Sequence, residues 1–84
     1  MGLKVVLIED EPSIARHIQR ILTELEREIS VIEHLTNVED AILWLRRNMA
    51  RCDLIFSDIR LSDGLSFEIF KKVPLIKPII FLLM

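Results

Sequence analysis

Val5-Val6-Leu7-Ile8-Glu9-Asp10-Glu11 is a short apolar run that ends abruptly in three acidic residues. An apolar run without polar alternation is typical of a strand that is buried on both faces of a parallel sheet. Leu54-Ile55-Phe56-Ser57-Asp58 repeats the pattern later in the chain. Ligands of open parallel sheets bind beyond the carboxyl ends of the strands. If the two strands are neighbours, about 4.8 Å apart, Glu9, Asp10 and Asp58 are expected to share one pocket.

Three carboxylates in one small pocket repel one another unless a cation lies among them. Hard oxygen ligands beside a phosphate site suit Mg2+, so the sequence predicts a magnesium site. A simpler interpretation is that Glu9 and Asp10 are acids at the positive N-terminus of a following helix. Asp58 taken alone could cap a helix or form a turn. The combination of all three favours the metal site over either alternative.

Composition limits the classes of protein to which the chain can belong. With 84 residues, 51% of them hydrophobic, residues 1–84 are expected to form a single domain of modest stability. The net charge of −2 without a basic block argues against direct nucleic-acid binding. A lone Cys52 fits a reducing cytoplasm. The N-terminus lacks an apolar signal-peptide core and the closing run 78–84 is too short to span a bilayer, so no membrane association is expected.

Hydrophobic periodicity predicts strands that alternate with helices. Helical spacing extends from Pro12, a residue tolerated in a first turn, to about Arg27. A second helix follows Thr36 and Asn37, which offer two overlapping N-cap registers, with Glu39 or with Asp40. The alternation βαβαβαβ implies a parallel sheet with right-handed crossovers. The expected strands are 4–8, 29–35, 53–57 and 79–83, the second of them at the sheet edge.

The segment after Asp58 is expected to contain a turn and a short helix. Ser62-Asp63-Gly64 has turn composition, since glycine supplies dihedral angles that other residues avoid. A helix over 66–72 is predicted to turn Phe67 and Phe70 inward, and Val73-Pro74 ends it.

Two motifs resemble the receiver domain of bacterial two-component response regulators. They are Ile8-Glu9-Asp10-Glu11-Pro12-Ser13 and the stretch from Asp58-Ile59-Arg60 through Ser62-Asp63-Gly64 to Phe67. The shortened loop between Asp58 and Gly64, followed by Phe67-Glu68-Ile69-Phe70, is most similar to receivers of the LytTR type. The resemblance extends through Phe81. It implies a flavodoxin-like α/β fold of three layers, with a doubly wound parallel sheet of order 2-1-3-4.

The resemblance also implies a role for each acidic residue. Asp58 would be the phosphoacceptor and, with Asp10, a direct Mg2+ ligand. Glu9 would bind the metal through a water molecule, and Arg60 would supply a backbone carbonyl. A sensor histidine kinase would donate the phosphoryl group, and the output, in a longer protein, would be transcription. Such a domain assists its own phosphorylation and dephosphorylation but is not otherwise an enzyme.

The sequence departs from the family at its end. Receivers have five strands and five helices, whereas this sequence ends in the fourth strand, as an incomplete receiver without the final strand and the last two helices. Leu83 occupies the position of the family's Ser or Thr switch residue, and the usual Lys has no counterpart. The alternative function is therefore an interaction module without phosphorylation switching, with a homo-oligomer formed through the exposed edge of Ile79 to Met84. A phosphoaspartate hydrolase is weaker, because Arg60 stands where a general acid would be needed.

The remaining polar and aromatic residues are expected to be structural. His17 and His34 have no Cys or His at metal-ligand spacing and are interpreted as surface residues. Trp44 is interpreted as a core or groove-covering residue and Cys52 as a packing residue. Arg46-Arg47 is interpreted as a solvated helix end.

Overall fold

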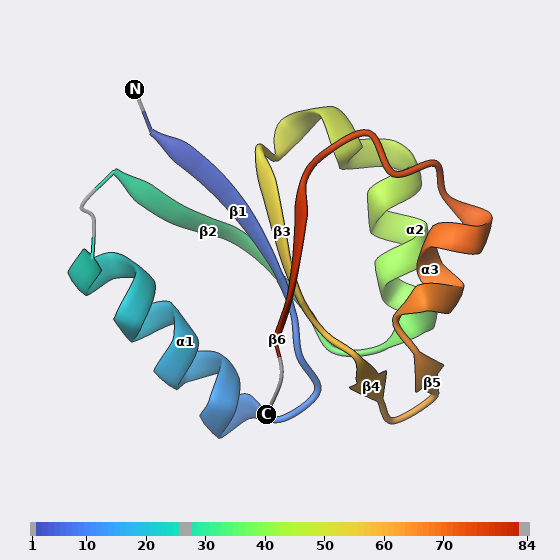
Figure 1. The fold of residues 1–84 in the computed structure, drawn as a ribbon, viewed down its shortest axis with the longest axis horizontal. Helices are drawn as coiled ribbons and strands as arrows, with labels where there is room; N and C mark the ends of the chain where they lie inside the picture. The colour runs from blue at the N-terminus through green and yellow to red at the C-terminus, as the bar shows by residue number, and fades with distance from the viewer. Residues whose placement is uncertain (1, 26–27, 83–84) are drawn as a thin grey trace.

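The computed structural model describes residues 2–25 and 28–82 of the chain, and its main sheet has helices on both faces (Figure 1). The predicted alternation of strands and helices is confirmed. The elements are β1 (Leu3–Ile8), α1 (Pro12–Leu25), β2 (Ile29–Leu35), α2 (Val38–Asn48), the 3-10 turn η1 (Met49–Arg51), β3 (Leu54–Asp58), β4 (Arg60–Leu61), β5 (Gly64–Leu65), α3 (Phe67–Lys72) and β6 (Ile79–Leu82).

The main sheet is parallel throughout, with strand order β2-β1-β3-β6. β6 is the fourth strand of the prediction, so the expected order 2-1-3-4 is confirmed. The helix α1 covers one face of the sheet, and α2 and α3 cover the other (Figure 1). This is the three-layer, doubly wound arrangement of the flavodoxin-like receiver fold. The predicted edge position of β2 is also confirmed.

β1 connects the two halves of the core because its side chains alternate between the faces. Val6 and Ile8 are buried with residues of α2 and α3, whereas Val5 and Leu7 are buried against α1. All four side chains are 0% exposed. Burial of each such aliphatic side chain contributes roughly 1.5–3 kcal/mol, which fixes β1 and the acidic residues that follow it.

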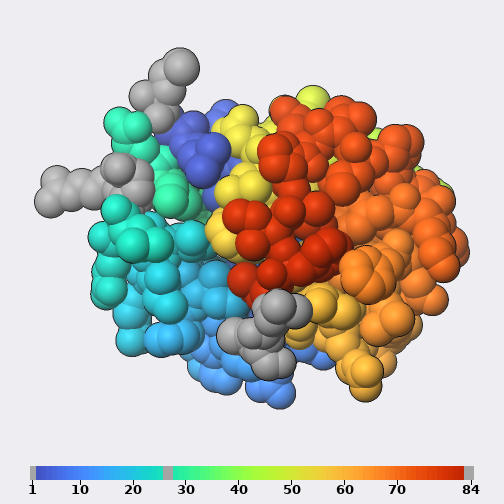
Figure 2. Space-filling model, in the orientation of Figure 1, coloured from blue at the N-terminus to red at the C-terminus, as the bar shows by residue number. Residues whose placement is uncertain are grey.

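β6 forms the other edge of the sheet, and no further strand of the described residues pairs with its outer side. Its Ile80 is 45% exposed, and residues of this strand lie at the surface in Figure 2 (red). Unpaired backbone groups along an apolar edge favour pairing with another chain. Self-association through this edge stays a prediction, and the last residues of the proposed contact, Leu83 and Met84, lie outside the described residues.

The third helix differs from the prediction. It begins at Phe67, and its inward position is taken by Ile69, which is 0% exposed, while Phe67 is 46% exposed. Residues two apart on a helix are separated by about 200°, so Phe67 and Ile69 cannot share a face. Phe67 instead lies edge-on to Phe81, with ring centroids 5.0 Å apart. The prediction for Phe67 was wrong, whereas Phe70 is partly buried against the core as expected.

A small antiparallel hairpin, β4–β5, occupies the segment predicted as a simple turn. Arg60 pairs with Leu65 and Leu61 with Gly64. Gly64 has φ of +146°, a conformation that L-residues with a side chain rarely adopt. The boundaries of β3 also shift by one residue, so that Asp58 is its last residue rather than the residue after it.

The N-terminus of α2 is capped both by Asn37, which precedes the helix, and by a residue of the β4–β5 hairpin. Asn37 Oδ1 accepts a hydrogen bond from the Asp40 amide at 2.8 Å, which selects the Asn37–Asp40 register of the two predicted. The carboxylate of Asp63, in the hairpin turn, accepts from the Val38 amide at 2.8 Å and the Glu39 amide at 3.2 Å. Three amides of the first helical turn, which lack partners within the helix, are thereby satisfied.

Candidate functional site: an acidic pocket at the carboxyl edge of the sheet

The three acids predicted to converge do so. Glu9 and Asp10 follow β1 and Asp58 ends β3, and these strands are neighbours, with Ile8 paired to Ser57. One carboxylate oxygen from each of Glu9, Asp10 and Asp58 lies within 4.8 Å of the others. The convergence follows from strand polarity, because adjacent parallel strands end at the same edge of the sheet.

Glu9 is the least solvated of the three acids. Its side chain is 1% exposed, and its Oε2 atom has no hydrogen-bond partner. Burial raises the pKa of the Glu9 carboxyl to about 7, helped by a hydrogen bond to Asp58 and by repulsion from Asp58 and Asp10, while a hydrogen bond from the Glu11 backbone opposes the shift. The metal-free pocket therefore holds a proton on Glu9 in the range where a solvated glutamate is ionised.

Asp58 is half-buried and faces a pocket that opens to solvent. Its Oδ1 accepts a hydrogen bond from the Ile59 amide at 2.8 Å, which orients the carboxylate. The pocket at this edge is lined by Asp10, Asp58, Ile59, Arg60, Leu61, Ser62 and Leu82. Arg60, the predicted carbonyl donor, thus lines the same pocket. Leu83, the predicted switch position, lies outside the described residues, although its neighbour Leu82 pairs with Asp58 in the sheet.

The chain after Asp58 is held by Ser66. The Ser66 amide and hydroxyl both donate to the Ile59 carbonyl oxygen, at 2.9 and 3.2 Å, and Ser66 is 0% exposed. Together with the β4–β5 pairing, these bonds fix the backbone that follows Asp58. Sequence reasoning missed Ser66, because an isolated serine near a helix start gives no signal of a partner seven residues earlier.

The chain after β1 is held by β2. The Glu9 amide donates to the Leu35 carbonyl at 2.9 Å, and His34 Nε2 lies 2.7 Å from the Glu9 carbonyl oxygen. His34 was predicted to be a surface residue. It is half-buried instead, and its ring contacts the backbone of a pocket residue. His17, by contrast, is exposed on α1 as expected.

The acidic pocket has the donor chemistry that Mg2+ requires. It offers carboxylate oxygens from two strand ends, and the buried Oε2 of Glu9 has no partner within the protein. An unpartnered buried acceptor costs free energy that a cation or its bound water would recover. The residues present therefore fit a small divalent cation. Within residues 2–25 and 28–82, no other group of three or more Asp, Glu, His or Cys side chains converges in this way.

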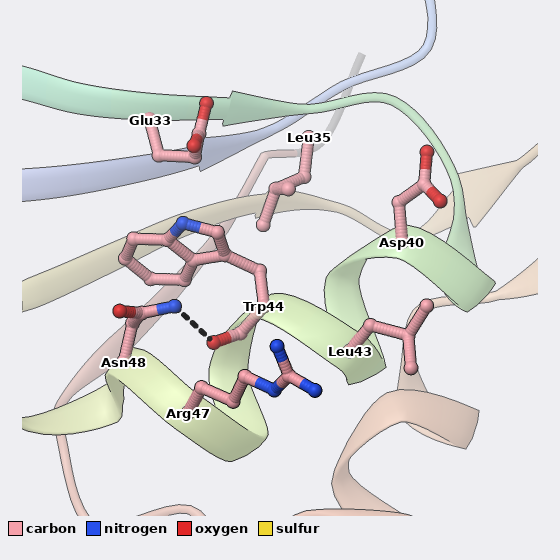
Figure 3. Close-up of a pocket in the computed structure, with 7 residues that line it drawn as sticks. All are labelled: Glu33, Leu35, Asp40, Leu43, Trp44, Arg47 and Asn48. Atoms are coloured by element: carbon pink, nitrogen blue, oxygen red, sulfur yellow. Dashed lines mark hydrogen bonds between the residues drawn. The ribbon is translucent and has the colours of Figure 1, made fainter.

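A second pocket lies between β2 and α2 (Figure 3). Trp44 lies at its centre, and the side-chain amide of Asn48 donates a hydrogen bond from Nδ2 to the Trp44 carbonyl oxygen at 3.0 Å. Its charged residues are dispersed: Glu33 is on β2, Asp40 is in the first turn of α2 and Arg47 is in the last turn. The other lining residues are Leu35 and Leu43. This pocket has no convergent reactive groups, so it is not the candidate site.

Cys52 has the packing role that was predicted. It is 0% exposed, its thiol donates to the Met49 carbonyl at 3.3 Å, and burial raises its pKa above the ordinary thiol value. Among the helices of the described residues, none is both long and apolar enough to cross a lipid bilayer.

Known proteins with similar sequences or folds are response regulators. The chain is 40% identical over 67 residues to the sensory transduction protein LytT of Bacillus anthracis, a match that covers 80% of this chain and 26% of LytT. The receiver domain of the hybrid histidine kinase CckA superposes with a TM-score of 0.77 at 23% identity, over 93% of this chain and 72% of that one. The non-phosphorylated HemR receiver domain from Leptospira biflexa superposes with a TM-score of 0.74 at 25% identity, over 95% and 63%. No family model matches the chain.

These matches define the class of the protein. The fold is that of a receiver domain, a phosphoacceptor signalling module. The chain is a homologue of the response regulators of two-component phosphorelay signalling, and the part of it that matches LytT spans about a quarter of the length of LytT.

Proposed function

We propose that this chain accepts a phosphoryl group on Asp58 from a sensor histidine kinase, in a reaction that depends on Mg2+. The observation that carries the proposal is the approach of Glu9, Asp10 and Asp58 to within 4.8 Å at the carboxyl edge of a receiver sheet. The match is to a sensory transduction protein, and the resemblance to LytTR-type receivers is the reason for proposing an output in transcription. The buried, unpaired Cys52 and a histidine kinase donor both favour action in the cytoplasm.

Asp58 would act as the nucleophile. One oxygen, Oδ1, is held by the Ile59 amide, so the other carboxylate oxygen is oriented to attack phosphorus. The P–O bond to Asp58 forms as the P–N bond of the phosphohistidine breaks, and the kinase histidine keeps the electron pair of that bond. The bonds from Ser66 to Ile59 keep the attacking side chain from moving during the transfer.

Asp10, Asp58 and the Arg60 carbonyl would hold Mg2+, with Glu9 acting through a bound water. When bound, the ion would neutralise charge that develops on the transferred group and relieve the repulsion among the acids. Glu9 would then be ionised, since a neighbouring cation favours the charged form of a carboxyl. Beyond this transfer and the later hydrolysis of the aspartyl phosphate, which releases inorganic phosphate, no enzymatic activity is proposed.

The test is phosphorylation by acetyl phosphate with Mg2+, read by intact-protein mass. Wild type should gain one phosphoryl group, and Asp58→Ala should gain none. Glu24→Gln, which removes an exposed acid on α1, is the matched control and should be labelled like wild type. Equal labelling of Asp58→Ala and wild type would remove Asp58 from the role.

A second candidate function is favoured by the exposed edge of β6. In this alternative the chain is an interaction module that forms a homo-oligomer through Ile79 to Met84 without a phosphorylation switch. Light scattering on the phosphorylation samples separates the two. An oligomeric state that changes with phosphoryl loading supports the switch, whereas a constant oligomer with no labelling supports the interaction module.

A further inference from the structure

We propose that His34 is a positioning residue that holds the acidic loop after β1 in its metal-binding geometry. The ring lies on the edge strand β2, 25 residues along the chain from Glu9, and its Nε2 is 2.7 Å from the Glu9 carbonyl oxygen. The inference rests on the proposed function, because it concerns the same Mg2+ pocket, and it adds a residue to which neither the sequence nor the comparisons assign a role.

The chemistry of the contact fixes the direction of the hydrogen bond. A carbonyl oxygen can only accept, so Nε2 of His34 carries the proton and donates. Both the neutral ring with its proton on Nε2 and the imidazolium satisfy this requirement. The bond is therefore available in either charge state of His34, and the role does not depend on its titration.

Glu9 is held by β2 on both sides of its backbone. Its amide donates to the Leu35 carbonyl at 2.9 Å, and its carbonyl accepts from His34. The first bond continues the β1–β2 ladder, whereas the second is made by a side chain at the point where the ladder ends. The carbonyl of Glu9 belongs to the peptide group that joins it to Asp10. Fixing that peptide plane sets the directions in which both acidic side chains leave the backbone.

The pocket needs such a restraint because its own charges oppose it. The carboxylates of Asp10 and Asp58, which converge with that of Glu9 within 4.8 Å, push the loop away from β3 when no cation is bound. The Glu9 side chain is also only 1% exposed. Hydration favours an exposed carboxyl group, so the fold must hold this side chain in its buried position. A donor on the Glu9 carbonyl resists both tendencies without adding a ligand to the metal, which is how residues outside the coordination sphere tune metal affinity.

The experiment compares His34→Phe, which keeps a planar ring but loses the donor, with His34→Gln, which keeps a side-chain N–H. His17→Phe, at the exposed histidine of α1, is the matched control. The full chain is titrated with Mg2+ while backbone amide NMR signals of Asp10 and Asp58 are followed, and the metal-free spectra are compared first. We expect His34→Phe to raise the Mg2+ dissociation constant about tenfold. We expect His34→Gln to keep most of the affinity and His17→Phe to match wild type.

Two outcomes would overturn the proposal. One is a metal-free spectrum of His34→Phe in which the Asp10 and Asp58 signals coincide with those of wild type. The other is a Mg2+ affinity within twofold of wild type, even if His34→Phe unfolds more easily, because a purely structural role would change stability alone. If wild type itself binds no Mg2+, the proposed function fails, whereas the metal-free Asp10 and Asp58 signals still decide the role of His34.

Discussion

Two regions of this molecule use carboxylates in opposite ways. At the start of α2, the exposed Asp63 accepts hydrogen bonds from the Val38 and Glu39 amides, which lower its pKa, the Val38 bond most strongly. At the carboxyl edge of the sheet, burial raises the pKa of Glu9 to about 7, and Asp58 and Asp10 add to the rise. The first carboxylate is stabilised by the fold, whereas the second is destabilised by it.

The difference lies in what surrounds each negative charge. Backbone N–H groups at a helix N-terminus complement an anion, so Asp63 needs nothing from outside the chain. The acids of the pocket face one another, and the positive charge that would satisfy them must come from a ligand. An acid that the protein leaves unsatisfied is a marker of function, and an acid that it satisfies is a marker of structure.

The largest expected effect concerns Glu9. In the presence of a chelator, the free energy of unfolding should fall as pH rises from about 4.5 to about 7, because Glu9 ionises in the unfolded chain before it can do so in the folded one. The shift corresponds to roughly 3–4 kcal/mol at most. Glu9→Gln should abolish this fall and should be the more stable protein above neutrality. Urea unfolding at a series of pH values measures both.

The control for that experiment is Glu24→Gln, which should keep the pH dependence of wild type because Glu24 is exposed on α1. If the free energies of unfolding of wild type and Glu9→Gln had parallel pH profiles, the pKa of Glu9 would not be raised by the fold.

The second effect sharpens the comparison by supplying the missing charge. Mg2+ at a hundred times its dissociation constant should raise the free energy of unfolding of wild type by about 2.7 kcal/mol. Asp10→Asn should be more stable than wild type without metal, because repulsion is relieved, and should gain little from Mg2+. Thermal unfolding with and without Mg2+ tests both statements. A metal response of Asp10→Asn equal to that of wild type would contradict the acidic-pocket interpretation.

The smallest effect concerns Asp63, whose carboxylate already has its hydrogen-bond donors within the protein. Asp63→Ala leaves two amides of α2 without their acceptor and should cost roughly 0.5–2 kcal/mol, the usual range for loss of a helix cap. Asp63→Asn keeps one acceptor oxygen and should cost less. Because the pKa of Asp63 is lowered in the folded state, its contribution should be present above the ordinary value of 3.8 and lost as pH falls through the lowered pKa. Neither variant should change the increase in stability that Mg2+ produces. A changed increase would show that the two regions are energetically coupled.

The sequence predicted the part of the fold that depends on hydrophobic periodicity. Apolar runs at residues 4–8 and 53–57 indicated buried parallel strands, and parallel strands bring their carboxyl ends to one edge. That rule alone predicts that Glu9, Asp10 and Asp58 lie together. The Asn37 cap was also among the two registers that the sequence offered.

The features that the sequence could not predict are contacts between short or distant segments. The strands β4 and β5 have two residues each, too few to show a period. Asp63 reaches a helix 25 residues earlier, and His34 reaches a backbone carbonyl, which carries no sequence signal at all. The error at Phe67 arose because a helix of six residues has room for only one or two inward positions, and Ile69 takes one of them.

Trp44 gives the chain a spectroscopic reporter of its own. It is the only tryptophan, it is half-buried, and the Arg51 guanidinium lies 5.9 Å from its ring centroid. Unfolding exposes this indole to water, so its emission should shift to longer wavelength as α2 separates from the sheet. Because Trp44 does not line the acidic pocket, the emission follows loss of the fold rather than occupancy of the pocket. Unfolding can therefore be followed by this emission at any Mg2+ concentration, without a direct contribution from occupancy of the pocket.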